Sequence, residues 1–253
     1  MLLIGLGFSV GVIGTLIGVG GGFILVPALL FLFPQADHLW ITSVSMWVIA
    51  FNATSGSITY FIHGRVHVRA ALLFALASFP GSVMGVWLGR FVGRSVFETV
   101  FGTAMILYAC VLFLKKSPKH EAASLHGQSM LSRPIVIQGV VISFFVGFMA
   151  SLLGIGGGVV HVPLMSHVLG FPVHLATGTS HMILAATAWF TTFVHWRDGD
   201  FQLSDPTIWK LGLPAILGAQ LGAHWSRRVS GPIILKLLSV ALFFVGVRLL
   251  WPR

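Results

Sequence analysis

A glycine-rich phrase occurs twice in this chain, each time inside a long apolar stretch. The first copy covers positions 18–22 (Gly-Val-Gly-Gly-Gly) and is followed by Pro27. The second covers positions 154–158 (Gly-Ile-Gly-Gly-Gly) and is followed by Pro163. In a helix interior each glycine costs about 1 kcal/mol relative to alanine, and a proline removes a backbone hydrogen bond. The phrase therefore predicts that a helix breaks at both places.

The composition indicates an integral membrane protein. Hydrophobic residues make up 56% of the chain and charged residues 8%, whereas soluble domains are about 25% charged. The net charge of +9 does not indicate nucleic acid binding, because the basic residues stand at the ends of apolar segments, where they orient a protein in a membrane. Cys110 is the single cysteine, so no internal disulfide can form.

The apolar segments predict an all-α membrane protein built as two repeats of four membrane segments. About 20 apolar residues span a bilayer as a helix. The first segment of each repeat is longer than one span and is broken, or re-entrant, at its glycine run. The expected segments are 2–33, 40–62, 70–89 and 97–114 in the first half, and 135–169, 175–196, 207–225 and 232–251 in the second.

These segments divide the chain into a first membrane repeat at 1–114, a polar cytoplasmic linker at 115–134 and a second membrane repeat at 135–253. The halves also match in a hydroxyl cluster after each glycine phrase and in glycines spaced four apart, at Gly85 and Gly89 and at Gly218 and Gly222. A duplicated unit explains the ordered matches. The spaced glycines predict close helix packing.

Two topologies remain open at this stage. If each broken stretch crosses the membrane, the two repeats are parallel; if each dips in and returns, they are inverted. Both arrangements put most of the 15 Lys and Arg residues on the side of the linker, which the positive-inside rule assigns to the cytoplasm. Inverted repeats with discontinuous helices recur among secondary transporters.

The broken helices predict an anion site. A helix that restarts inside the protein presents unpaired N–H groups and the positive end of its dipole, and glycine lets a ligand approach the backbone. Hydroxyls of the following segments can donate hydrogen bonds without adding charge. The alternative is that the glycines only permit tight helix crossing. The candidate substrate-binding residues are Gly20, Gly21, Gly22, Thr42, Ser43, Ser45, Gly156, Gly157, Gly158, His161, Thr179 and Ser180.

The placement of the ionisable residues narrows the ligand. All six Asp and Glu residues fall in loops or at segment ends, which argues against a proton relay of buried carboxylates and against a carboxylate cation site. His161 lies inside the second phrase, opposite Leu25 of the first, and could hold an anion or take up a proton. A simple hydrogen-bonded core histidine is an equally good interpretation.

Two other functions stay open. One is a transporter of a metal or another small cation that uses His161 and neighbouring histidines, although no Cys ligands accompany them. The other is a non-transporting membrane assembly protein, in which the glycines serve packing alone. The chain has neither a nucleotide-binding loop nor a hydrolase motif, so we expect no enzyme activity, no cofactor and no bound metal. The sequence does not decide whether the chain forms a homo-oligomer.

The duplicated phrase, the Thr-Ser cluster after it and the short Gly-Arg turn at 64–65 resemble the sulfite exporter TauE/SafE family of membrane permeases. The resemblance spans essentially the whole chain. It implies a secondary transporter in the cell inner membrane that moves small sulfur-containing anions (sulfite, thiosulfate or organosulfonates) by alternating access. The matching positions are Gly18, Gly20, Gly21, Gly22, Pro27, Ser45, Gly154, Gly156, Gly157, Gly158, Pro163, Thr179 and Ser180.

One departure from symmetry lies in the hydroxyl cluster of the first half, where Val44 stands at the position of Thr179. A site with matching hydroxyls from both halves is therefore not expected.

Overall fold

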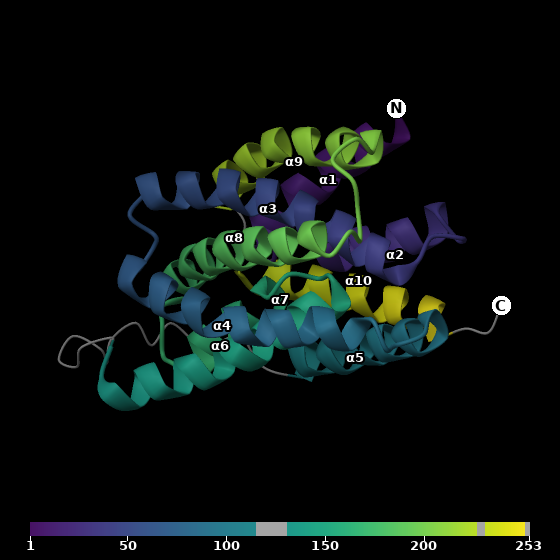
Figure 1. Ribbon diagram of the computed structural model, residues 1–253. Helices are drawn as coiled ribbons and strands as arrows, with labels where there is room; N and C mark the ends of the chain where they lie inside the picture. Colours follow the sequence, from purple (N-terminus) through teal and green to yellow (C-terminus); the bar gives the residue numbers. More distant parts are fainter. Residues whose placement is uncertain (115–130, 227–230, 251–253) are drawn as a thin grey trace.

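The computed structural model describes residues 1–114, 131–226 and 231–250, which form one bundle of α-helices (Figure 1). In chain order the helices are α1 (Leu2–Ile17), α2 (Gly22–Leu32), α3 (His38–Ile62), α4 (Val68–Gly89), α5 (Arg94–Leu114), α6 (Arg133–Leu153), α7 (Gly158–His167), α8 (Val173–Arg197), α9 (Pro206–Trp225) and α10 (Gly231–Leu250). No strand occurs in these ranges.

Glycine-lined seams join helices that are far apart in the sequence. α1 packs along α9, and α4 packs along α6. A side chain at Gly11 would meet the backbone of Ala215, and one at Gly85 would meet the backbone carbonyl of Phe148. Such close backbone approach is how helices associate in lipid, where hydrophobicity gives no driving force. The packing role predicted for the spaced glycines thus holds for Gly85, Gly218 and Gly222, whereas Gly89 meets only side-chain atoms.

The bundle has two chemically different ends. One, the acidic end, carries the five described acidic residues. At this end Gly89 contacts the start of α3, and Arg90 contacts the loop after α8. These acids are Asp37, Glu98, Asp198, Asp200 and Asp205. The other, the basic end, carries Arg65, Arg69 and Arg133 and none of the five acids, whereas Arg90, Arg94 and Arg197 lie among the acids at the acidic end. Both ends are visible in Figure 1, with the start of α1 at the acidic end.

The central helices α3 and α8 pack together and run in opposite directions. α8 starts at the basic end, where the Thr179 hydroxyl accepts a bond from the backbone N–H of His67, which follows α3. α8 ends at the acidic end, where His195 contacts Asp200, a residue that also binds Arg90.

The two broken stretches also approach from opposite ends. α1 runs parallel to α9, which begins after Asp205 at the acidic end. α2 then finishes at the same end, where Phe33 packs on Trp40. In the second half α6 begins beside α4 at the basic end. α7 leads back there to Phe171, which contacts the ring of His67.

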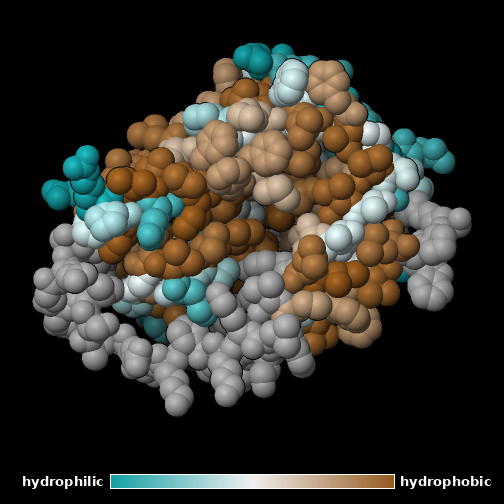
Figure 2. Space-filling view, turned by 90° about the horizontal axis from the view of Figure 1, so that it is seen from below, coloured by the Kyte–Doolittle hydropathy of each residue, from teal (hydrophilic) through white to brown (hydrophobic). Residues whose placement is uncertain are grey.

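The outer surface is apolar, as a lipid-facing surface requires. In the face seen in Figure 2, hydrophobic residues cover most of the described area and hydrophilic ones gather toward its margins. Large exposed side chains include Leu76 and Trp87 of α4 and Leu217 of α9. Among the described helices, α4 and α6 are long and apolar enough to cross a membrane, while α1 and α2 are apolar but shorter.

Segment boundaries expected from the sequence agree with the helices within about three residues. The linker expected at 115–134 is described only from Leu131 onward, and there α6 already begins at Arg133, because Ser132 and Pro134 form a helix start. Residues 115–130 lie outside the described part of the chain. Glu98, expected at a segment end, lies in the second turn of α5 and pairs with Arg94.

Candidate functional site

Two short loops break the helices at the glycine phrases. Loop 1 (residues 18–21) joins α1 to α2, and loop 2 (residues 154–157) joins α6 to α7. Positive φ angles occur at Gly18 (80°), Gly20 (87°) and Gly21 (81°) in loop 1, and at Gly154 (68°) and Gly156 (69°) in loop 2. Residues with a Cβ rarely adopt these angles, so the glycines are required by the backbone itself.

Both loops meet in the centre of the bundle. Side chains built at Gly20 and at Gly156 would touch the same two residues, Ile49 of α3 and Leu184 of α8. Each of these lies near the middle of a helix of 25 residues. The two loops therefore reach the same central layer although they come from opposite ends of the bundle.

The starts of α2 and α7 also lie in this layer. Gly22, the first residue of α2, packs against the carbonyl of Ile155 in loop 2, and Gly158, the first residue of α7, packs against Val19 in loop 1. All residues of both loops are buried. Neither helix start has a side-chain cap, so its dipole is directed into the protein interior without a local acceptor side chain.

A cluster of polar side chains makes hydrogen bonds to loop 1 and to the end of α1. Asn52 of α3 donates its side-chain N–H to the carbonyl of Gly20 at 2.9 Å and accepts the hydroxyl of Thr15 at 2.7 Å. The Tyr60 hydroxyl donates to the Thr15 carbonyl at 2.8 Å. All three side chains are buried. None was among the predicted site residues, although Asn52 in an apolar segment was a signal that could have found them.

Loop 2 is held by hydroxyls. Ser45 of α3 donates to the carbonyl of Gly154 at 2.6 Å, and Ser151, just before the loop, lies 3.0 Å from the hydroxyl of Thr191 on α8. Ser45 was predicted to bind substrate. In the structure its hydroxyl bridges α3 to the loop that carries the other predicted residues.

The remaining predicted hydroxyls differ in their surroundings. Thr42 and Ser43 donate to carbonyls of their own helix, at Leu39 and Trp40. Thr179 accepts from the backbone of His67 and so secures the connection between α3 and α4. The Ser180 hydroxyl is buried without a hydrogen-bond partner among the described residues. A free hydroxyl of this kind is available to a ligand.

His161 stands beside loop 2. Its ring is buried, with Nε2 3.1 Å from the Ser143 hydroxyl and Nδ1 without a partner. A side chain added at Gly157 would come 3.1 Å from that Nδ1 atom. On the side of loop 1, His181 is also buried with a free Nδ1, and its Nε2 lies 3.4 Å from the Thr15 hydroxyl. His181 was not among the predicted residues.

The predicted residues thus separate into groups. The structure brings Gly20, Gly22 and Gly156 together around Ile49, whereas Gly21 lies against Val10 and Gly157 lies next to His161. It places Thr42, Ser43 and Thr179 in bonds to the backbone instead. Across the described residues, no group of three His, Cys, Asp or Glu side chains could hold a metal ion. No Lys, Arg, Asp or Glu is counted among their buried residues, so the central layer is polar but uncharged.

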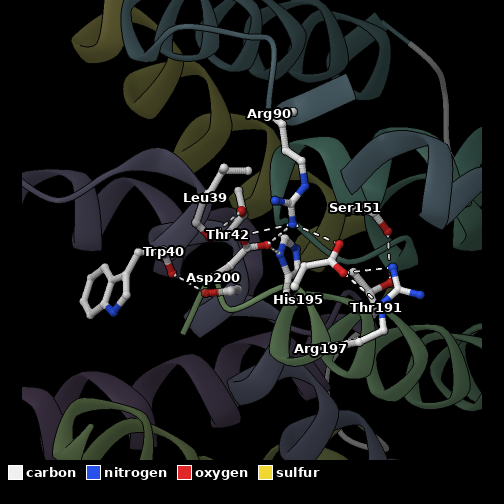
Figure 3. A network of polar contacts seen from close by, with 12 residues as sticks. Leu39, Trp40, Thr42, Arg90, Ser151, Thr191, His195, Arg197 and Asp200 are labelled. Carbon is white, nitrogen blue, oxygen red and sulfur yellow. Dashed lines mark hydrogen bonds and ion pairs between the residues drawn. The ribbon is translucent and has the colours of Figure 1, made fainter. Parts of the chain in front are cut away.

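A second polar cluster, at the acidic end, escaped the sequence interpretation (Figure 3). It joins Arg90, which follows α4, to Asp198, Asp200 and His195 at the end of α8. These residues fall at segment ends, where charged side chains are usually solvated, so the sequence carries no signal of their contact.

Comparisons with known proteins place this architecture in a family. The family model described as "Sulfite exporter TauE/SafE" matches residues 3–249. The chain belongs to the TauE/SafE family. A "Probable membrane transporter protein YunE" of Bacillus subtilis is 29% identical to it, over 99% of this chain and 97% of its own length. No solved structure matches the chain.

More distant relatives also match this chain over nearly its whole length. A "Probable membrane transporter protein" of Methanocaldococcus jannaschii is 25% identical over 98% of this TauE/SafE chain and 94% of its own length. A "Probable membrane transporter protein" of Xylella fastidiosa is 23% identical over 99% of this chain and 95% of its own length. The family membership therefore rests on the whole chain, and it identifies a membrane-embedded protein of a transporter family.

Proposed function

We propose that this TauE/SafE protein is a secondary transporter that moves small sulfur-containing anions, such as sulfite, thiosulfate or organosulfonates, across the inner membrane by alternating access. The observation that carries the proposal is the meeting of two glycine loops in one buried central layer. Paired discontinuous helices at mid-depth are typical of substrate sites in secondary transporters. The family description supports sulfite as a member of the substrate class.

An anion suits this layer better than a cation. Two helix starts without side-chain caps, at Gly22 and Gly158, direct positive dipole ends into it. The free Ser180 hydroxyl and the free Nδ1 of His161 can supply further donors. Within the described residues no buried carboxylate competes for these donors.

The two membrane repeats are inverted in this proposal, and each broken stretch is re-entrant. Support comes from the opposite directions of α3 and α8 and from the reciprocal packing of α1 on α9 and of α6 on α4. The basic end then faces the cytoplasm, as the positive-inside rule favours. Because the loops enter from opposite ends, each could open toward one side of the membrane while the other stays closed.

Alternating access further requires a state in which the site is closed to both sides. Complete burial of loops 1 and 2 is consistent with such a state. A metal-transporting function finds less support, since His161 and His181 are flanked by hydroxyls and not by carboxylate or thiol ligands. We therefore retain the anion transporter as the single proposal.

The proposal can be tested at Gly157, whose φ of −66° accepts alanine without backbone strain. The added methyl would lie 2.7 Å from Val146 and 3.1 Å from Nδ1 of His161, so these side chains beside loop 2 would have to shift. We expect Gly157→Ala to lower the flux of sulfite and thiosulfate into proteoliposomes at least tenfold. It should also remove the thermal stabilisation that these anions give the solubilised protein.

Gly5→Ala is the matched control, because Gly5 is exposed on α1 and nothing lies within 4 Å of the added methyl. It should leave flux unchanged. If Gly157→Ala folds and carries the anions as fast as the unmodified protein, the site is elsewhere. If no sulfur anion is carried or stabilises the unmodified protein, the substrate class is wrong.

A further inference from the structure

The polar cluster at the acidic end contains a histidine that is almost inaccessible to solvent (Figure 3). The His195 side chain is 1% exposed, and its Nδ1 lies 2.7 Å from Oδ2 of Asp200. Arg90 places Nη2 3.0 Å from Asp200 and 2.9 Å from Asp198, and Arg197 lies 2.8 Å from the other oxygen of Asp198. The cluster therefore joins the end of α4 to the end of α8 through ionic contacts.

The hydrogen bonds indicate the protonation state of His195. An ionised carboxylate only accepts, so Nδ1 of His195 carries the hydrogen and donates it to Asp200. Its Nε2 is buried with no partner among the described residues. A second N–H at that position would be a buried donor without an acceptor, which is costly. Nε2 is therefore the ring nitrogen that the described residues leave without a contact.

Without a further proton the cluster is electrically balanced. Arg90 and Arg197 carry two positive charges, and Asp198 and Asp200 carry two negative ones. A proton on Nε2 of His195 would add a positive charge without a new counter-ion.

Neighbouring elements carry further charged groups at this end: Arg94 of α5 pairs with Glu98, and Lys210 of α9 is exposed. On α3 and just before it, His38 bonds to the Gly89 carbonyl and contacts Asp37. Before α9, Asp205 accepts from Trp40 and from the Thr207 backbone. The other groups that α6 and α8 present nearby are hydroxyls, such as those of Ser151 and Thr191.

The position on α3 that corresponds to His195 on α8 is occupied by Tyr60 and not by a histidine. Tyr60 stands as far along α3 from Ile49 as His195 stands along α8 from Leu184. Tyr60 holds the Thr15 carbonyl behind loop 1 and stays neutral at physiological pH. Histidine is the side chain that titrates in this range. At this matched position, therefore, α8 carries a histidine where α3 carries a tyrosine.

Hydroxyls lead from His195 toward the central layer. Thr191 and Thr187 occupy preceding turns on the same helix, where Thr191 contacts Ser151 at 3.0 Å and Thr187 contacts Ser78 at 2.7 Å. Ser151 lies three residues before Gly154 of loop 2. Polar side chains therefore lie along α8 between His195 and the level of loop 2.

We propose that Nε2 of His195 is a proton-binding site whose occupancy is coupled to anion transport. Asp200 holds the other nitrogen of the same ring, Nδ1. A proton from water binds the lone pair of Nε2 and gives an imidazolium, and no other bond changes. Its charge compensates that of one monoanion in the central layer, where the described residues offer no Lys or Arg. The inference rests on the proposed anion transport and adds the co-transported ion.

Proteoliposomes loaded at about pH 8 and diluted into medium at about pH 7 test the coupling, with the membrane potential held at zero by potassium and valinomycin. Methanesulfonate is the probe, because its charge is constant in this range, and thiosulfate is measured in parallel. One proton per monoanion lets a gradient of one pH unit, worth about 1.4 kcal/mol, accumulate methanesulfonate about tenfold. A pH-sensitive dye inside the vesicles should record the accompanying proton.

His195→Gln keeps a neutral polar side chain at this position but has no basic nitrogen that could bind the proton. We expect it to equilibrate methanesulfonate without accumulation and without a dye signal, and Asp200→Asn to weaken both. His224→Gln is the control, since His224 is exposed on α9. Should His195→Gln still accumulate the anion tenfold, or the unmodified protein carry it without any response to the gradient, the proton site is refuted while anion transport stands.

If both variants fail to fold, the dye measurement on the unmodified protein still decides whether a proton accompanies the anion, and the absence of a signal refutes the proton site. If neither methanesulfonate nor thiosulfate enters the vesicles in any pH condition, the proposed function itself is contradicted, and this inference with it.

Discussion

Asn52 offers a quantitative test of how loop 1 is fixed. Its side chain makes two bonds between structural elements, to the Gly20 carbonyl and from the Thr15 hydroxyl, and it is completely buried. Interhelical hydrogen bonds in membrane proteins contribute about 0.6 kcal/mol on average and about 1.7 at most. Asn52→Leu, which keeps the number and branching of the heavy atoms, should therefore lower the free energy of unfolding by about 1 to about 3 kcal/mol.

A double-mutant cycle isolates one of these bonds. Thr15→Val removes the hydroxyl that donates to Asn52 and keeps the shape of the side chain. The interaction energy of the two substitutions should be about 0.6 kcal/mol and no more than about 1.7. Unfolding in mixed micelles of mild detergent and dodecyl sulfate, followed by tryptophan fluorescence, gives the four free energies.

Thr99→Val is the matched control for the hydroxyl, because Thr99 is exposed on α5 and bonds only to the Ser95 carbonyl of its own helix. It should change the free energy of unfolding by less than about 0.5 kcal/mol. If the effects of Thr15→Val and Asn52→Leu add to within about 0.3 kcal/mol, the hydrogen bond contributes nothing measurable. The bond between Thr15 and Asn52 would then have no part in fixing loop 1.

Two further substitutions test the helix seam and loop 2. Gly85→Leu should prevent α4 from packing on α6, because its Cβ would collide with the Phe148 carbonyl; loss of more than about 3 kcal/mol in the same unfolding assay is expected, and a stable Gly85→Leu protein would contradict the seam. Ser45→Ala should cost about 1 kcal/mol and slow sulfite flux, since it deletes the bond to Gly154. Unchanged stability and flux in Ser45→Ala would show that loop 2 is positioned by other contacts.

Helix positions and the two breaks were predictable from the sequence. Apolar runs of about 20 residues need to be helices in lipid, where every backbone group must find a partner within the segment. The breaks followed from local backbone chemistry, because Gly20 and Gly156 adopt angles that other residues rarely reach. Both are properties of short stretches of chain, which a sequence displays directly.

Helix partners were not predictable in the same way. In a membrane protein both the lipid-facing and the buried sides of a helix are apolar, so periodicity does not identify the neighbour of α1. The hydroxyls illustrate the same limit at the site. Ser45, Thr179 and Ser180 have similar chemistry and corresponding positions in the two halves, but their contacts differ. Ser45 bonds to loop 2, Thr179 bonds to the backbone of His67, and Ser180 has no hydrogen-bond partner among the described residues.

The seam between α1 and α9 has a consequence for the order in which the protein assembles. Gly7 lies against Leu211, so about two hundred residues are synthesised between one side of this contact and the other. Until α9 emerges, the glycine face of α1 has no native partner and is left to lipid or to transient neighbours. Contacts of such high sequence separation form late. Chains truncated before α9 should therefore leave α1 accessible to proteases in the membrane, and completion of α9 should protect it.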